Sequence, residues 1–584
     1  FSFYRVRWDD HNYRTFVMLD ENATEEDVED KIRYIFKKYN PGADNIEFYL
    51  EPLTDIHLYS EISTEGSSNI VYIYFLSVLG VFVLIIACIN FMNISTARSA
   101  YRFKEIGMRK VVGGRRKNII FQFYNESMLL SLVSLVIALI LVYLILPSFS
   151  NFTERELSFS SLINPEILVI VLCITFFTGI VAGSYPALYL SSFKPVSALK
   201  GSAKSGKRGS LFRRILVVVQ FTGSVILIIG TFTIYSQIDF VLGKDLGWNK
   251  EHLMYIQLRG NSKQYYEVLR EELIKNPKIL SVASGMYSPS SFNSSTSGLN
   301  WSGKNPELSV NVRYNFVDFD YIDTAEYNII NGRKFSRELG ADAATGYIIN
   351  ESLAKIMGVD PVIGHDFNFW GMQGKIIGVI KDFHFRSLRS EIEPMVMMLL
   401  SRRESWRSYA ILRLNTDDIT STVNFIENTW DTIIPDSPIV NGFVDDQLNS
   451  MYMEDRRTAN MLNYFAALAV FIGCLGLFGL VSFAAEKRKK EIGVRKTLGA
   501  SILTIIRLML KEFNYLIIIS NCIAWPVSYV LMQKWLDDFS YRIDMGIDIF
   551  LLSGSLIIVI AMLTVSYQSI KAAVSNPVDS LRYE

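Results

Sequence analysis

Seven long apolar segments constrain this 584-residue chain more than any other feature of its sequence. A helix needs about 20 apolar residues to cross the hydrocarbon core of a bilayer, and each segment is long enough to do so. A buried helix of a soluble protein could explain one such segment but not all of them. The sequence therefore predicts a polytopic α-helical membrane protein with spans at residues 71–95, 124–147, 166–190, 215–236, 461–485, 512–533 and 547–570.

The positive charges between the spans predict which loops face the cytoplasm. Three loops are rich in lysine and arginine, and two others are poor in both: 98–118, 191–214 and 486–511, against 148–164 and 534–546. One topology satisfies all seven spans, with residues 1–70 and 237–460 outside and the C-terminus inside. The formal net charge of the chain is zero, so no nucleic-acid partner is expected.

The two outside segments have the patterns of folded domains. In 237–460, short strand-like runs such as 375–380 and 409–414 alternate with helical stretches at 262–275 and 419–433, which is typical of an α+β domain. The serine-rich stretch 288–298 is expected to be a loop. Residues 24–39 carry a helix-capping pattern followed by an apolar helical face, so a helix is expected there as well.

The chain contains an internal repeat. KEIGMRKVVGG at 104–114 matches KEIGVRKTLGA at 490–500, with seven of eleven positions identical. Each copy follows one span and precedes two more, and each triplet of spans ends in a similar segment, KPVSALK at 194–200 and NPVDSLR at 576–582. The chain is therefore predicted to be two tandem four-span modules, of which the first lacks its opening span. We expect an eighth span and the rest of the first outer domain before residue 1 in the natural protein.

The repeat fixes the expected domain boundaries. They are 1–70, the C-terminal part of the first outer domain; 71–200, the first module, with a cytoplasmic helix at 98–114; 201–214, a linker; 215–236, the span that opens the second module; 237–460, the second outer domain; and 461–584, the rest of the second module, with a cytoplasmic helix at 486–500.

The repeated cytoplasmic segment has an order of residues that a simple basic anchor does not need. Glu105 precedes Arg109 by four residues, the favourable order for an ion pair on a helix, and Glu491 and Arg495 repeat it. A glycine also recurs inside each predicted helix, at a cost of roughly 1 kcal/mol relative to alanine, which suggests close approach of another backbone. We interpret both segments as docking helices, with these candidate contacts: Lys104, Glu105, Gly107, Arg109, Lys110, Lys490, Glu491, Gly493, Arg495 and Lys496.

Two further carboxylates occupy matching positions near the cytoplasmic starts of their spans, Glu126 and Glu512. A carboxylate inside a membrane segment is costly unless it is paired or hydrated. They could support the docking helices by pairing with basic residues, or they could lie at the interface beside a helix N-terminus, where the helix dipole favours a negative charge. The sequence leaves both interpretations open.

Catalytic and metal-binding motifs are not found. Residues 201–208, GSAKSGKR, fit most of a phosphate-binding loop but have Arg208 where serine or threonine should hold magnesium. Asp382, His384 and Arg386 alternate along one extended segment, which is better explained by a salt-bridged strand than by a site. The chain is therefore expected not to be an enzyme and to need no cofactor.

These features together resemble the permease subunits of MacB/FtsX-type ABC transporters. The resemblance rests on the KEIGxRKxxG segment after a span, the tail segments 194–200 and 576–582, and the outer stretches 350–358 and 378–388. It implies a bacterial cytoplasmic (inner) membrane protein in which one chain supplies both halves of a pair. It also implies a separate ABC ATPase, in two copies, that docks on the helices 98–114 and 486–500.

The resemblance implies a function of mechanical transmission, in which ATP binding moves the spans and the outer domains. The expected outcome is export or extraction of a peptide, drug or lipoprotein-like substrate, with a periplasmic adaptor or outer-membrane channel as a further partner besides membrane lipid. The alternatives are an FtsX-like regulator of a cell-wall hydrolase and a membrane sensor.

Overall fold

The computed structural model describes residues 15–35, 47–56, 58–60, 69–99, 103–113, 115–153, 158–160, 164–191, 207–244, 246–385, 388–415, 418–487 and 489–574. The chain forms two compact units. We call them the membrane unit, residues 63–237, 455–536 and 543–584, and the outer unit, residues 1–62, 238–454 and 537–542.

Seven helices of the described chain are long and apolar enough to cross a membrane. They are α3 (Asn69–Ser99), α5 (Arg116–Thr153), α6 (Pro165–Ser191), α8 (Lys207–Gly243), α15 (Met453–Lys487), α17 (Ile502–Leu536) and α18 (Ile547–Val574). The prediction of a polytopic helical membrane protein is thus confirmed. Several helices are longer than their apolar segments: α5 begins at Arg116, because long basic side chains keep their charges in water while the backbone stays helical.

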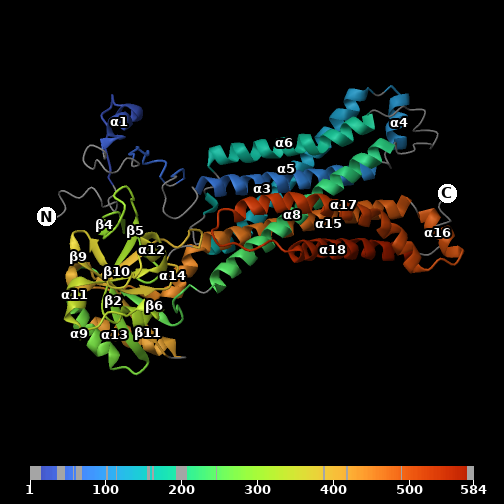
Figure 1. Ribbon diagram of the computed structural model, residues 1–584. Helices are drawn as coiled ribbons and strands as arrows, with labels where there is room; N and C mark the ends of the chain where they lie inside the picture. The colour runs from blue at the N-terminus through green and yellow to red at the C-terminus, as the bar shows by residue number, and fades with distance from the viewer. Residues whose placement is uncertain are drawn as a thin grey trace. The chain divides into compact units, whose positions relative to one another are not determined.

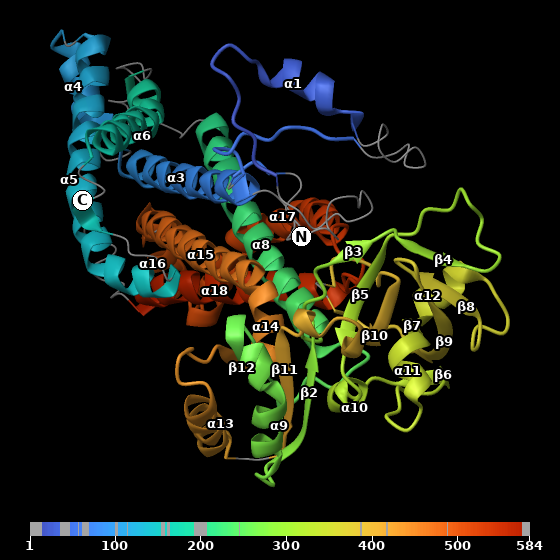
Figure 2. The ribbon, with the colours of Figure 1, turned by 90° about the vertical axis from the view of Figure 1, so that its left-hand side faces the viewer.

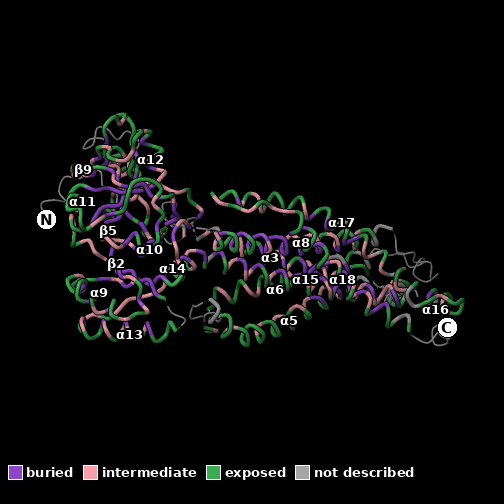
Figure 3. The backbone as a smooth tube through the Cα atoms, turned by 60° about the horizontal axis from the view of Figure 1, so that its bottom comes forward, coloured by how far each residue is buried: buried purple, intermediate pink, exposed green. Residues whose placement is uncertain are grey.

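The long helices of the membrane unit differ in how much of their surface is covered by protein. The most apolar part of α8 is largely buried, whereas no residue in the most apolar part of α5 is buried. Figure 3 shows the same contrast as long exposed stretches along α5. Apolar side chains facing outward are stable here because lipid tails are as apolar as they are.

Glycines and small polar residues let the helices of the membrane unit approach closely, as is common in membranes. The last two spans of each module are neighbours, α5 with α6 and α17 with α18. Gly183 of α6 faces Ser127 of α5, and Gly554 of α18 faces Asn521 of α17. Ser520 of α17 donates a hydrogen bond of 3.2 Å to the backbone carbonyl of residue 218 in α8.

The outer unit is built on one mixed sheet with the strand order β12-β1-β11-β2-β5-β10-β7-β9-β8-β4; β3 pairs with β5, and β6 pairs with β9. The strands are β1 (Leu253–Gln257), β2 (Ile279–Gly285), β3 (Ser295–Thr296), β4 (Leu299–Trp301), β5 (Val312–Val317), β6 (Ile329–Gly332), β7 (Gly346–Asn350), β8 (Asp366–Phe369), β9 (Met372–Ile380), β10 (Met395–Leu399), β11 (Tyr409–Leu414) and β12 (Asn441–Phe443).

Helices pack against this sheet. They are α9 (Tyr266–Ile274), α10 (Tyr321–Ala325), α11 (Gly340–Thr345), α12 (Glu351–Met357), α13 (Ile419–Ile433) and α14 (Val444–Met451), with 3-10 turns at Gly260–Tyr265, Leu400–Arg402 and Glu404–Trp406. The helices α9 and α13 lie beside each other near β11 (Figure 2). Between them and the strands, Tyr266, Leu269, Ile426 and Trp430 are buried in one apolar cluster.

The expected α+β domain is confirmed, with local differences. The predicted serine-rich loop contains the two-residue strand β3, and α1 (Glu25–Ile32) ends before residue 39. Thr24 caps α1 by accepting a bond from the backbone N–H of Asp27, as the capping pattern predicts. The predicted extended strand at 382–386 is not a strand in its described part: Asp382 accepts bonds from the backbone N–H and the hydroxyl of Ser352 instead. Arg386 lies outside the described residues.

The short loop between α17 and α18 is held by the outer unit. The centre of the Tyr541 ring lies 3.2 Å from the Lys244 ammonium and 4.7 Å from the centre of the His384 ring, which it meets edge to face. The backbone N–H and hydroxyl of Ser540 both donate to the carbonyl of Arg389, at 3.2 and 2.9 Å. This loop therefore joins the ends of two spans to the outer unit by specific contacts.

Replacing Tyr541 by alanine is expected to speed amide hydrogen exchange in residues 537–542 about 5- to 30-fold, because a well-placed cation–π contact contributes roughly 1–2 kcal/mol. Hydrogen exchange followed by mass spectrometry measures this directly. Tyr541→Phe keeps the ring and should exchange at the wild-type rate. Equal exchange in the alanine variant would show that the ring does not hold the loop.

Candidate functional site

Two short helices carry the repeated motif and lie at the same end of the membrane unit (Figure 1). They are α4 (Phe103–Val111) and α16 (Lys489–Thr497). Both are shorter than predicted, because residues 98 and 99 belong to α3 and residues 486 and 487 belong to α15. Each is followed by a glycine with positive φ, Gly113 at 97° and Gly499 at 86°, a conformation that glycine adopts without strain and that commonly ends helices.

The predicted ion pair forms in both helices with the same geometry. The guanidinium of Arg109 lies 2.8 Å from the carboxylate of Glu105, and that of Arg495 lies 2.8 Å from Glu491. All four side chains are exposed, so each pair contributes less than about 1 kcal/mol to folding. The pairs are therefore better suited to presenting charge in a fixed position than to stabilising the fold.

Each of the two helices also has one buried isoleucine, away from the exposed ion pair. Ile106 is buried in a cluster with Ile119 and Phe123 of α5 and Ala187 of α6, and Ile492 is buried at the matching position of α16. With the isoleucine facing inward, the ion pair faces outward. Each helix thus has one apolar contact face and one charged outer face.

Exposed apolar side chains accompany each ion pair, and the sequence analysis missed them. Met108 and Val112 in the first copy are exposed, the latter by 83% of its surface, and so are Val494 and Leu498 in the second, the latter by 80%. The available signal was that these positions are apolar in both copies of a segment that is otherwise basic. Apolar side chains next to fixed charges are typical of surfaces that bind another protein.

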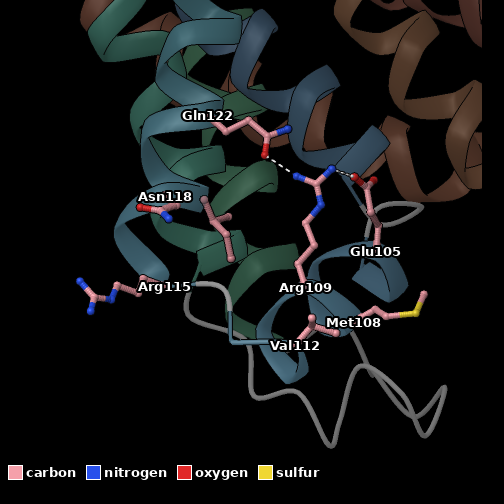
Figure 4. A pocket seen from close by; sticks show the side chains of 8 residues that line it. Glu105, Met108, Arg109, Val112, Arg115, Asn118 and Gln122 are labelled. Atoms are coloured by element: carbon pink, nitrogen blue, oxygen red, sulfur yellow. Dashed lines mark hydrogen bonds and ion pairs between the residues drawn. The ribbon is translucent and has the colours of Figure 1, made fainter.

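The first copy also has a cavity of about 500 Å³ between α4 and the start of α5 (Figure 4). Arg109 extends across it and donates a second hydrogen bond of 2.8 Å to the side-chain oxygen of Gln122, a residue that the sequence analysis also missed. The cavity is lined by Glu105, Met108, Arg109, Val112, Arg115, Asn118, Ile119 and Gln122.

The second copy differs at the positions that complete this cavity. Counting from the repeated motif, Gln122 corresponds to Leu508 and Arg115 corresponds to Ser501. The leucine at position 508 cannot accept the hydrogen bond that Gln122 accepts from Arg109, so Arg495 has no equivalent of this bond. The two faces share the ion pair and the apolar side chains but differ in charge.

The remaining predicted site residues fall into two groups, those whose side chains the structure describes and those whose side chains it does not. Burial lowers the pKa of Lys110 below its ordinary value, with the charge of Arg116 as a second cause. Glu126 is exposed on α5, so its predicted pairing with the docking helix remains a prediction. The side chains or surroundings of the other members lie outside the described residues: Lys104, Gly107, Lys490, Gly493 and Glu512.

Comparison with known proteins matches the two modules separately. The family model described as FtsX-like permease C-terminal matches residues 77–195 and 463–577. Among curated proteins, the macrolide export ATP-binding/permease protein MacB of Bdellovibrio bacteriovorus is 32% identical over 20% of this chain and 17% of its own length. MacB of Escherichia coli K12 is 35% identical over 21% of this chain and 19% of its own length. The chain thus spans about a fifth of the length of these relatives.

Among solved structures, the periplasmic region of MacB from Actinobacillus actinomycetemcomitans matches with a TM-score of 0.27 and 15% identity, over 36% of this chain and 97% of that one. The extracellular domain of the ABC-type transporter YknZ from Gram-positive bacteria matches with a TM-score of 0.25 and 13% identity, over 32% of this chain and 98% of that one.

The family matches cover the segments that carry the repeated motif and the three spans around it. Each match begins in a span, α3 or α15, includes the short helix that follows, α4 or α16, and ends after the last span of its module. With its seven candidate spans and its α+β outer unit, the chain is a multi-pass membrane protein that is similar to MacB-type permeases and carries two segments that match the FtsX-like permease C-terminal model.

Proposed function

We propose that this chain converts ATP hydrolysis by a separate ABC ATPase into movement of its outer domains, for export or extraction of a substrate from the outer side of the membrane. The observation that carries the proposal is the repeated docking face. Both α4 and α16 present an ion pair with the same 2.8 Å geometry next to exposed apolar residues. Two such faces at one end of the membrane unit suit two ATPase subunits (Figure 1).

The motion would reach the outer unit through the chain itself. The helix α8 continues past the membrane unit into the outer unit, which begins again at Ile238. The loop 537–542, held by Lys244, His384 and Arg389, provides a second covalent path from α17 and α18. A shift of these spans would therefore pull on the outer unit at two separate places.

Reversing both arginines, Arg109→Glu with Arg495→Glu, is expected to weaken ATPase binding about 10- to 100-fold, since lost charge contacts at an interface each cost about 1–3 kcal/mol. The measurement is binding of the purified ATPase to the chain in lipid nanodiscs, together with its ATP hydrolysis rate. Unchanged binding would remove the coupling role from these helices.

Two controls separate docking from folding. Lys534→Glu reverses an exposed charge at the far end of α17 and should leave ATPase binding unchanged. The exchanged pairs, Glu105→Arg with Arg109→Glu and Glu491→Arg with Arg495→Glu, keep the ion pair within each helix but move the positive charge by one turn. If the ATPase contacts the arginine at its native position, the exchanged pairs are expected to bind the ATPase as weakly as the charge-reversal variant does. Binding at the wild-type level would show that the ion pair acts only by stabilising the helix.

A further inference from the structure

The first of the two docking faces holds its arginine by both ends of the guanidinium group. Nη2 of Arg109 lies 2.8 Å from the carboxylate of Glu105, and Nη1 donates a bond of 2.8 Å to the side-chain oxygen of Gln122. Figure 4 shows the guanidinium between these two partners, of which Glu105 belongs to α4 and Gln122 to α5. Rotation of the side chain would break one of the two contacts, so the planar group is fixed in one orientation.

In the second docking face, the arginine has its partner on one side. Nη2 of Arg495 lies 2.8 Å from Glu491, and among the described residues no other side chain bonds to this guanidinium. The counterpart of Gln122 is Leu508, whose side chain has no acceptor atom. The neighbouring Arg507 cannot take over the role, because a guanidinium has no acceptor atom either.

The cavity of about 500 Å³ indicates which chemistry fits the first face. Its lining combines the apolar side chains of Met108 and Val112 with the charges of Arg109 and Arg115. Arg115 is exposed, and its counterpart in the second copy is the neutral Ser501. A partner segment that fits this face has an acidic side chain for the guanidinium next to an apolar side chain for the cavity.

Fixing an arginine before its partner arrives lowers the cost of binding. A long side chain that becomes immobilised at an interface loses rotamer freedom, which weakens binding about 2- to 10-fold. Both arginines are about half exposed and can be reached by a partner. The exposed ion pair of Arg495 orders its side chain only weakly, whereas Gln122 gives Arg109 a second fixed contact. The first face is therefore preorganised for binding, and the second is not.

We infer that the two docking faces are unequal, and that the ATPase docks first and more tightly at α4, where Gln122 positions Arg109. The face on α16 is the weaker, second site. Gln122 is a positioning residue that acts through Arg109. The inference rests on the proposed function in one respect, namely that an ABC ATPase is the partner of both faces. At a limiting amount of ATPase, one chain then carries one ATPase, bound to its first module.

Phenylglyoxal, a reagent that modifies free guanidinium groups, tests the positioning in the absence of any partner. In the whole chain in lipid nanodiscs, Arg109 is expected to react about 2- to 10-fold more slowly than Arg495, because its guanidinium is held at both ends. Mass spectrometry of the modified peptides measures both rates in one sample. Equal rates, or faster modification of Arg109, would overturn the inference.

Exchanging the residue at the two matched positions tests the role of Gln122. Gln122→Leu copies the second face into the first and should raise the rate at Arg109 to that at Arg495, whereas Gln122→Glu keeps an acceptor and should keep the slow rate. The reciprocal variant Leu508→Gln should slow the modification of Arg495, a gain that misfolding cannot produce. If Gln122→Leu leaves the rate at Arg109 unchanged, Gln122 does not position Arg109 and the inference is wrong.

Protection from the same reagent tests the order of docking. The ABC ATPase that co-purifies with the chain is titrated without nucleotide, so that ATP does not pair the two bound subunits. Arg109 is expected to be half protected at an ATPase concentration about 2- to 10-fold lower than Arg495, and Gln122→Leu should bring the two concentrations together.

The outcomes of this titration separate the inference from the proposed function. Protection of both arginines at the same concentration, or of Arg495 first, would overturn the unequal docking and leave the proposed function standing. Protection of neither arginine at saturating ATPase would overturn the proposed function, and the inference with it.

Discussion

Replacing Arg413 by methionine is expected to lower the free energy of unfolding of the outer unit by about 3–5 kcal/mol, because a buried guanidinium here satisfies several backbone carbonyls at once. Arg413 lies in β11 and is 5% exposed. Its nitrogens donate to the carbonyls of Glu251 at 2.6 Å, Asn249 at 2.8 Å and Thr324 at 2.8 and 3.1 Å. One side chain thus connects the turn before β1 and the helix α10 to β11, the third strand from one edge of the sheet.

Methionine fills much of the same space but donates no hydrogen bond, so three backbone carbonyl groups, of which that of Thr324 is buried, lose their charged donor. Urea dependence of hydrogen exchange at the β11 amides, measured on the whole chain, gives the free energy of unfolding. Lys334→Met is the matched control, since its ion pair with Asp323 is more than half exposed on both sides and should contribute less than about 1 kcal/mol. A loss below about 1 kcal/mol for Arg413→Met would contradict the assignment.

The second large effect is a dependence of outer-unit stability on pH that originates at Asp318. Its carboxylate accepts bonds from the hydroxyl of Tyr266 at 2.8 Å and from the backbone N–H and hydroxyl of Ser284 at 2.6 and 3.1 Å. Burial, as the largest cause, raises the pKa of Asp318 from its ordinary value of 3.8 to about 6. The folded state therefore binds this proton more tightly than the unfolded state.

The sign follows from this order of pKa values. The contribution to stability is complete below pH 3.8 and is lost as the pH rises through about 6, at about 1.4 kcal/mol per pH unit and about 3 kcal/mol in total. Asp318→Asn cannot titrate, so the advantage of the wild type over this variant is expected to grow as the pH falls from 7 to 5. Urea unfolding at several pH values measures the difference.

Asp320 provides a control of opposite sign two residues away. Hydrogen bonds from Arg337, the largest cause, and the charges of Arg337 and Arg270 lower the pKa of Asp320. Its contribution is present at neutral pH and is lost only when the pH falls through that lowered value. The advantage of the wild type over Asp320→Asn should therefore change less between pH 7 and 5 than its advantage over Asp318→Asn, because the charge of Asp320 is only a lesser cause of the raised pKa of Asp318. Parallel curves for both variants would show that Asp318 titrates normally.

The membrane unit could be predicted in outline because its signals are local. About 20 apolar residues in a row admit few structures other than a spanning helix, and the pairs Glu105–Arg109 and Glu491–Arg495 follow from a spacing of four residues on a helix. The docking helices begin later than predicted, since α3 and α15 continue into the first basic residues. Hydropathy and charge do not define where one helix ends and the next begins.

The candidate docking site was only partly predictable. The charged residues of α4 and α16 stand out in the repeated motif, but Gln122 lies thirteen residues beyond Arg109 on another helix, and nothing in its local sequence indicates that it meets Arg109 at 2.8 Å. Met108 and Val112 are hydrophobic and would ordinarily be assigned to a buried face. They are exposed because Ile106, and not Met108 or Val112, fills the contact with α5 and α6.

The contacts within the outer unit were even less predictable from the sequence than those of the candidate docking site. The segment 409–414 is recognisable as a strand, but alternation along a strand does not say that Arg413 is buried or which carbonyls it binds. Those partners come from the turn before β1 and from α10, far apart in the sequence, and the strand order of the sheet decides that they meet. The raised pKa of Asp318 likewise depends on Tyr266 and Ser284, which reach it from other elements.

The sequence by itself determined the helices that are long and apolar enough to span a membrane, the duplication and the ion pairs of α4 and α16, because hydropathy and helical spacing act over one or two turns or over one helix. The tertiary structure decided which distant residues meet. The side-chain amide of Asn90 in α3 lies against Gly476 of α15. Nothing in either local sequence indicates this contact, because it depends on how the whole set of spans packs.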